Sequence, residues 1–168
     1  MLRRLAAAAI LVLTMTSVPP SGAIAASSTA SNVSYERFVT AAAPLTVPRG
    51  KAASTWTSPV FSPGFAFTEL VASWNADTPT GSLVEVDLQA SPGGSYWTKW
   101  YVMGRWTYDD TVFHRTSVGG QGDGDGTVAI DTFIAGKVPM TSYRLQVVLT
   151  RASAKDPTPT VRALGAMA

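Results

Sequence analysis

The chain has 168 residues, no cysteine, and 13 basic against 11 acidic side chains. This length suits one domain with a core of its own. Without cysteine the chain can form neither a disulfide nor a thiol-based catalytic centre. No block of like charge occurs, so the composition excludes a typical nucleic-acid-binding surface.

The first 25 residues have the pattern of a secretory signal peptide. Arg3 and Arg4 precede an apolar run, residues 5–13, and a small-residue stretch ends in an A-x-A site at Ala25. The apolar run is shorter than the roughly 20 residues that span a bilayer. We therefore predict cleavage after Ala25, a secreted, extracellular product and no membrane attachment afterwards. Cleavage would leave 11 basic residues against 11 acidic ones.

The next segments predict a tail, a strand and a loop. Residues 26–34 are small and polar and are expected to form a flexible tail. Residues 33–40 are predicted as the first strand. Residues 41–55 contain two prolines and a glycine, which favours a loop. Residues 56–60 are expected to form a short edge strand, because Pro59 cannot donate to a β-ladder.

Two strands with clear period-two alternation follow, over 65–74 and 83–89. In the second of these, the side chains expected to face inward are Val84, Val86 and Leu88, and those expected to face outward are Glu85, Asp87 and Gln89. A turn over 91–94 leads into the strand 96–106, which holds three of the five tryptophans.

The strand 96–106 is predicted to have two unlike faces, because successive side chains of a strand point to opposite sides. The core set is Tyr96, Thr98, Trp100, Val102, Gly104 and Trp106, and the outward set is Trp97, Lys99, Tyr101, Met103 and Arg105. Trp74 is also expected in the core. If 83–89 and 96–106 form a hairpin, Lys99 should lie opposite Glu85 or Asp87.

The rest of the chain continues the β pattern. Strands are predicted over 112–118, 127–134, 143–151 and 160–164, and a glycine-rich loop over 119–126. With about eight short strands and no helix, the sequence predicts an all-β domain over residues 35–168. The expected fold is an antiparallel β-sandwich, jelly-roll-like and similar to galactose-binding domains.

The outward face of the aromatic hairpin is the main candidate ligand site. Exposed rings can stack on sugar rings while nearby carboxylates and cations bind hydroxyl groups. The candidate residues are Trp97, Tyr101, Lys99, Arg105, Glu85 and Asp87. The alternative is that these rings are structural, covered by another segment or by Lys99 and Arg105.

Two further chemistries have weaker support. Asp123 and Asp125 in the glycine-rich loop could bind Ca²⁺, although the EF-hand template fails and Asp-Gly is also a common turn. No other cofactor is expected. A hydrolytic triad would need the single histidine, His114, and no nucleophile-elbow motif occurs. The adjacent Asp109 and Asp110 should point to opposite sides of a strand, so a glycan-cleaving pair would need other carboxylates.

Several segments resemble one family when they are taken together. They are residues 67–79 (FTELVASWNADTP), 97–106 (WTKWYVMGRW), 115–123 (RTSVGGQGD) and 131–133 (DTF). This string resembles the N-terminal region of secreted actinobacterial proteins that carry a papain-like cysteine peptidase domain of the bacteriocin-processing family. The resemblance covers roughly residues 35–168.

The resemblance implies an accessory domain and not the peptidase itself. In such proteins the peptidase domain follows the segment that matches residues 161–168, and here the sequence ends there. With no cysteine, the expected function is non-catalytic, with cell-wall or extracellular polysaccharide as the expected ligand. The alternatives are a structural domain that packs on a peptidase in trans and, with less support, a glycan-cleaving enzyme.

Overall fold

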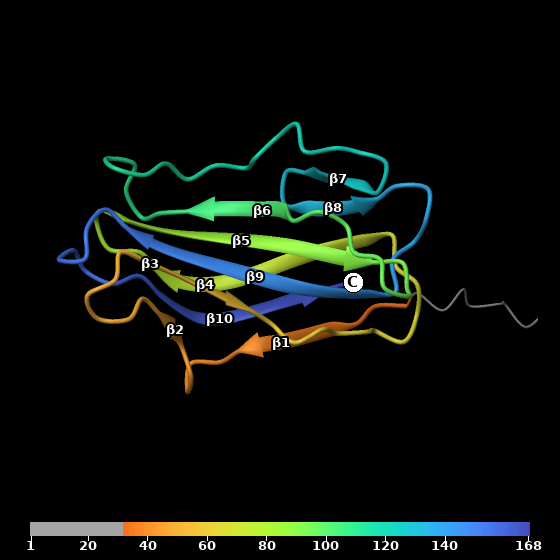
Figure 1. Ribbon diagram of the computed structural model, residues 1–168, viewed down its shortest axis with the longest axis horizontal. Helices are drawn as coiled ribbons and strands as arrows, with labels where there is room; N and C mark the ends of the chain where they lie inside the picture. Colours follow the sequence, from red (N-terminus) through yellow and green to blue (C-terminus); the bar gives the residue numbers. More distant parts are fainter. Residues whose placement is uncertain (1–31) are drawn as a thin grey trace, which may run out of the picture. The chain divides into compact units, whose positions relative to one another are not determined.

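The computed structural model describes residues 32–168 (Figure 1). This part of the chain contains no helix and ten strands in two antiparallel sheets, which confirms the predicted all-β sandwich. The predicted signal peptide and most of the predicted tail lie outside the described residues. The strands are β1 (Tyr35–Val39), β2 (Leu45–Thr46), β3 (Ala53–Thr57), β4 (Glu69–Asp77), β5 (Ser82–Ser91), β6 (Tyr101–Trp106), β7 (Gly126–Ala129), β8 (Thr132–Ala135), β9 (Ser142–Arg151) and β10 (Thr160–Met167).

The strand order is that of a jelly roll. One sheet has the order β1-β10-β4-β8-β7, with β2 paired to the start of β10, and the other has the order β3-β9-β5-β6. The pairs β1–β10, β3–β9, β4–β8 and β5–β6 are nested in the sequence and all antiparallel. The chain therefore forms one long antiparallel ribbon of four strand pairs, rolled so that its two halves stack as a sandwich.

The core between the sheets forms where the sequence alternates most regularly. The inward positions of β5 and β9 are fully buried, namely Val84, Val86, Leu88, Tyr143, Leu145, Val147 and Leu149. Each such side chain stabilises the fold by about 1.5–3 kcal/mol through burial. The ring of Tyr143 meets Phe38, Phe61 and Phe67 edge-on, which extends this core across both sheets.

Three predicted segments differ in the structure. The strand β3 begins at Ala53, inside the predicted loop 41–55, and lies at a sheet edge. Residues 112–118 form no strand and contribute one isolated bridge, between Arg105 and Thr116. The predicted strand 127–134 is a hairpin of β7 and β8, because Ile130 adopts a left-handed conformation (φ 62°) and reverses the chain there.

A β-bulge in β6 reverses the predicted faces of the aromatic strand before Met103, whereas residues 104–106 keep theirs. The paired residues are Val84 with Trp106, Glu85 with Arg105, Val86 with Gly104, Asp87 with Val102, and Leu88 with Tyr101. Met103 is thus the extra residue, and the in–out alternation shifts by one position across it. Tyr101 is therefore fully buried in the core, with its ring 5.1 Å from that of Phe133, and the prediction that it faces outward is wrong.

Several other assignments on this segment also differ. Met103 is buried, whereas Tyr96 and Trp106 are exposed. Residues 97–100 form no strand, so they do not alternate, and the prediction of Trp100 as a core residue is wrong. The predicted register with Lys99 opposite Glu85 or Asp87 is also wrong.

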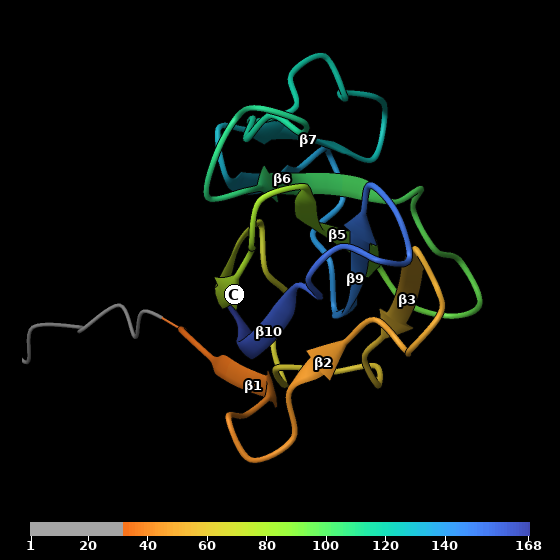
Figure 2. The same ribbon diagram turned by 90° about the vertical axis from the view of Figure 1, so that its left-hand side faces the viewer.

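The long connection between β6 and β7, residues 107–125, covers the free edge of β6 and forms the top of the molecule in Figures 1 and 2. It is tied there by the side chain of Gln121, which accepts from the backbone N–H of Val102 (2.7 Å) and donates to its carbonyl (2.8 Å).

In residues 32–168 no helix is long and apolar enough to cross a membrane.

Candidate functional site

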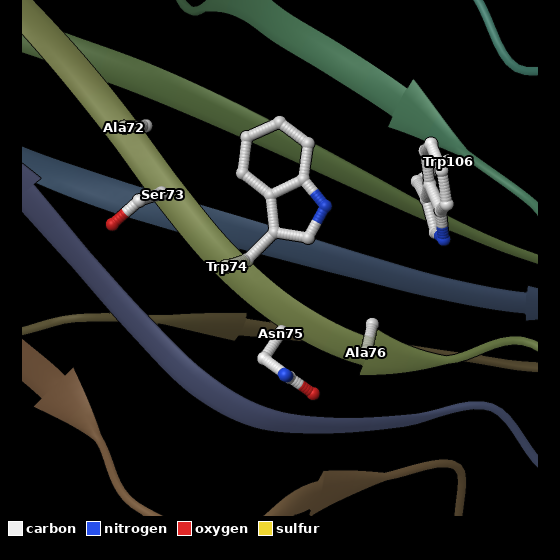
Figure 3. A pocket seen from close by; sticks show the side chains of 6 residues that line it. All are labelled: Ala72, Ser73, Trp74, Asn75, Ala76 and Trp106. Carbon is white, nitrogen blue, oxygen red and sulfur yellow. The ribbon is translucent and has the colours of Figure 1, made fainter.

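The sandwich is open along one side, between β4 and β6. The strand β8 pairs with β4 only over Glu69–Val71, so the part of β4 from Ala72 to Asp77 has β10 as its neighbour on one side and no strand on the other. Trp74 extends from this stretch towards β6, and its indole faces Trp106 at the end of β6 (Figure 3). The result is a groove between the two sheets with a tryptophan on each wall.

The groove is about 440 Å³ in volume and is lined by Ala72, Ser73, Trp74, Asn75, Ala76 and Trp106. Trp106 also lines two adjoining hollows, one beside Arg115 and Asp131 and one beside Thr78 and Tyr108. Trp106 is 39% exposed, which is unusual for a large ring at an inward position of its strand. The prediction that it belongs to the core is wrong, because β6 is an edge strand and the opposite sheet is incomplete at this point.

A side-chain donor without a protein partner points towards this groove. The indole N–H of Trp74 makes no hydrogen bond within residues 32–168, and its nitrogen lies on the side that faces Trp106 (Figure 3). The hydroxyl of Thr78, which follows β4 and lines an adjoining hollow, also lacks a partner, but it is buried away from the groove. An unpaired strand edge adds further backbone groups. A ligand with hydroxyl or amide groups could satisfy them.

Each cation near the groove already has an anionic partner. Arg115 lies over the ring of Trp106, with 5.6 Å between its Cζ and the ring centroid, and pairs with Asp110 at 3.1 Å. Arg105 pairs with Glu85 across the β5–β6 ladder. The groove therefore combines aromatic faces with neutral hydrogen-bonding groups and has little free charge.

Of the six predicted ligand residues, Glu85, Asp87 and Arg105 share the outer face of the β3-β9-β5-β6 sheet, as predicted. Asp87 is only 5% exposed, and its Oδ1 has no hydrogen-bond partner. Burial, together with the nearby Glu85 carboxylate, raises the pKa of Asp87 to about 7, and Arg105 opposes this effect. The Asp87 carboxyl is shielded from solvent, so it cannot serve as the predicted exposed ligand group in this conformation.

Trp97 is half-buried on the same outer face, beside Trp100. The guanidinium of Arg144 lies over both rings, with its Cζ 4.8 Å from the Trp97 centroid and 5.3 Å from that of Trp100. A cation thus covers the predicted stacking face of Trp97. The cover predicted from the sequence was Lys99 or Arg105, not Arg144. Arg144 lies far beyond Trp97 in the chain and reaches it because β9 pairs with β5.

The side chains of Lys99 and Tyr101 instead contact the glycine-rich loop at Asp123. Asp123 accepts hydrogen bonds from the Tyr101 hydroxyl and from the backbone N–H groups of Asp125 (3.0 Å) and Gly126 (3.2 Å), and it pairs with Lys99 at 3.0 Å. These donors, with Tyr101 first among them, lower the pKa of Asp123 to about 2.

This loop is the predicted calcium site, and its carboxylates are already engaged. Besides the donors on Asp123, the hydroxyl of Tyr96 donates to Asp125 at 2.6 Å. No group of three or more His, Cys, Asp or Glu side chains that could hold a metal occurs in the described part of the chain. Calcium binding here stays a prediction.

The residues considered for hydrolysis are engaged locally. His114 is exposed. Asp109 bonds Thr111 (2.6 Å), which lowers its pKa. Asp110 bonds the backbone and side chain of Arg115, and these contacts lower its pKa as well. Both groups therefore act as turn-forming acceptors in this structure.

The fold and the groove define a jelly-roll β-sandwich domain with an aromatic recess along its open side. The family model of the peptidase C39 N-terminal domain matches residues 19–168, so the chain belongs to this family. As an N-terminal domain in a peptidase family it is an accessory domain, in agreement with the predicted resemblance. No curated protein and no solved structure matches this sequence.

Proposed function

We propose that this accessory domain is secreted and non-catalytic and binds a cell-wall or extracellular polysaccharide in the groove between Trp74 and Trp106. The observation that carries the proposal is the position of the two indoles on opposite walls of an open groove. Flat indole faces bind the apolar faces of sugar rings, and free N–H and hydroxyl groups bind sugar hydroxyls.

The groove is better suited to bind a polysaccharide than the outer face that the sequence predicts. Trp106 is 39% exposed and lines three adjoining hollows, so several sugar units could lie along it. Trp97 is half-buried beneath Arg144, whereas Trp106 stays exposed although Arg115 lies over one of its ring faces. A tethered peptidase would gain a high local concentration at the wall from such a domain.

A pull-down on insoluble peptidoglycan and on an insoluble neutral glucan tests the proposal. We expect Trp106→Ala to lose most of the retention of the wild type on at least one of these polymers. Trp97→Ala is the matched control, since it removes the same side chain from the outer face, and it should be retained like the wild type. Loss in Trp97→Ala alone would return the site to the outer face, and equal retention of all three proteins would exclude both faces.

A second candidate function is packing on a peptidase in trans, and one surface favours it. A hollow of about 450 Å³ lies beside the end of β10 and is lined partly by Val33, Phe65 and Met167. Val33 is 61% exposed and Met167 is 48% exposed. Exposed apolar surface of this kind is typical of protein contacts.

The packing function is tested by adding the separately produced peptidase domain of a relative. Met167→Glu should weaken the complex, whereas Ile130→Glu, at an exposed turn of the β7–β8 hairpin, should not. Unchanged binding of the Met167→Glu variant would exclude this surface.

A further inference from the structure

Arg144 is held in an unusual position on the outer face of the second sheet. It lies on β9, directly opposite Gln89 of β5, and its guanidinium lies over Trp97 and Trp100. Each indole offers its electron-rich face to the cation. The two rings therefore pack against the guanidinium without neutralising its charge.

Gln89 holds the Arg144 side chain in place with two hydrogen bonds. The Oε1 atom of Gln89 accepts from Nε of Arg144 (2.8 Å) and from its Nη2 (2.6 Å). The amide of Gln89 is itself oriented, because its Nε2 donates to the carbonyl of Thr98 at 2.7 Å. Gln89 thus occupies the Nε–Nη2 edge of the guanidinium, and the Nη1–Nη2 edge remains available.

The Nη1–Nη2 edge has no partner in the described residues and is not fully buried. A guanidinium has five N–H donors in a fixed fork, and Gln89 takes two of them. Arg144 forms none of the ion pairs of residues 32–168, and residues 1–31 contain no Asp or Glu. Nη1 has no acceptor within the described residues and is not fully buried.

We infer that Arg144 is a preorganised binding site for an oxyanion group of a ligand, a carboxylate or a phosphate. The free N–H groups of Nη1 and Nη2 form the parallel pair that grips such a group with two hydrogen bonds. A free arginine loses much side-chain entropy on binding, whereas this one is already fixed by Gln89 and the two indoles. The site lies on the outer face and is separate from the groove.

The acidic residues of this face do not compete for the site. Glu85 is paired with Arg105, and Asp87 has a buried carboxyl whose neighbours across the strands are Val102 and Gln146. A bound anion would therefore meet one unpaired cation and no exposed, unpaired carboxylate on the adjacent positions of β5.

Isothermal titration at low ionic strength with three soluble probes tests the site. The probes are tetragalacturonate, which carries carboxylates, a glycerol-phosphate tetramer, and neutral maltotetraose. We expect the wild type to bind at least one anionic probe tenfold or more tightly than the neutral one. The stronger of the two anionic probes identifies carboxylate or phosphate as the preferred group. Binding of neither anion above the neutral level would overturn the site.

Three variants locate the effect. Arg144→Gln should reduce the affinity for the anionic probe to that for the neutral probe. Arg144→Lys keeps the charge and the aliphatic stem, so it should fold, but it loses the planar fork and should still lose about tenfold. Arg37→Gln makes the same change in net charge at an exposed residue of β1, in the other sheet, and should change affinity less than twofold.

The outcomes separate this site from general charge attraction and from the groove. Equal losses in Arg144→Gln and Arg37→Gln would show non-specific attraction and overturn the proposal, as would full affinity in Arg144→Lys. Binding of neutral polysaccharide through Trp106 does not depend on Arg144, so it should survive in all three variants. The two proposals can therefore fail independently.

Discussion

Gly104 lies against the indole of Trp74, so close that a Cβ at this position would stand 3.1 Å from Cη2 and 3.5 Å from Cζ2. The glycine of β6 thus makes the space that the tryptophan of β4 occupies, and the groove wall depends on it. The two residues come from different sheets, which means that the groove is built by the packing of the sandwich and not by a single loop.

Gly104→Ala should displace the Trp74 ring and weaken ligand binding in the groove. The extra methyl group overpacks this contact, which typically costs about 1–3 kcal/mol of unfolding free energy. Urea denaturation followed by tryptophan fluorescence measures the loss. Gly119→Ala is the control, since a Cβ there has no atom within 4 Å. A Gly104→Ala protein as stable as this control would contradict the close packing.

Asp87→Asn should change the pH dependence of stability. Folding raises the pKa of Asp87 from 3.8 to about 7, so between these values the folded state holds a proton that the unfolded state has lost. The free energy of unfolding contributed by this group therefore falls as the pH rises from about 4 to 7 and stays low above that. The difference between the two pKa values corresponds to a loss of at most roughly 4 kcal/mol in the free energy of unfolding.

The measurement is urea denaturation of both proteins between pH 4 and pH 8. The asparagine variant should lack this downward slope and should be the more stable protein at pH 8, because it carries no buried charge. Glu85→Gln should lower the pKa of Asp87 and move the slope to lower pH, since the Glu85 carboxylate contributes to the shift. Parallel pH profiles for wild type and Asp87→Asn would contradict this interpretation.

The regular strands could be predicted from the sequence, and the aromatic hairpin could not. In β5 and β9 apolar residues at every second position set the inward face, because that face is buried along the full length of each strand. In β6 the bulge at Met103 moved Tyr101 inward. Nothing in the local sequence marks that bulge, since its cause is the pairing with β5 and the packing around Phe133.

The candidate site was predicted in part for the same reason. Glu85, Asp87 and Arg105 do share one face, because they follow the regular part of the ladder. The groove and Arg144 were missed, since both depend on contacts between distant strands. Two signals could have pointed to the groove: Trp74 precedes the turn that ends β4, and Trp106 ends its strand, so both lie near strand ends where the cover is incomplete.

Asp123→Asn should open the glycine-rich loop. The Asp123 carboxylate accepts from the hydroxyl of Tyr101 and from two backbone N–H groups and pairs with Lys99, and loss of these charge-assisted contacts should cost about 1–3 kcal/mol. Since folding lowers its pKa to about 2, wild type should lose this stabilisation as the pH falls from about 4 towards 2. Asp131→Asn, at an exposed turn, is the control for urea denaturation at pH 7 and pH 3.

Calcium should leave the midpoint of thermal unfolding unchanged. The donors on Asp123 and the Tyr96 hydroxyl on Asp125 already engage three of the four carboxylate oxygens of this pair. Ligand binding to the folded state raises the midpoint in proportion to the logarithm of ligand concentration. A rise with excess Ca²⁺ that disappears in Asp123→Asn would establish the metal site and contradict this expectation.

Arg151, the last residue of β9, should contribute strongly to the stability of this end of the sandwich. It is 7% exposed and donates to the carbonyls of Lys51 (2.8 Å) and Asp156 (2.8 Å) and to the hydroxyl of Thr158 (3.0 Å). These acceptors belong to two connections, before β3 and before β10, so one guanidinium holds both against β9.

Arg151→Met keeps the apolar stem but removes the donor to three partly buried acceptors, so we expect a loss of about 3 kcal/mol in the free energy of unfolding. Arg151→Lys should recover only part of this loss, because a single ammonium group cannot reach acceptors that a planar fork joins. Arg162→Met removes an exposed pair with Asp77 and should cost less than about 1 kcal/mol. Chemical denaturation of the three variants measures these losses. Equal stability of Arg151→Met and Arg162→Met would show that the buried arginine stabilises the fold no more than an exposed one.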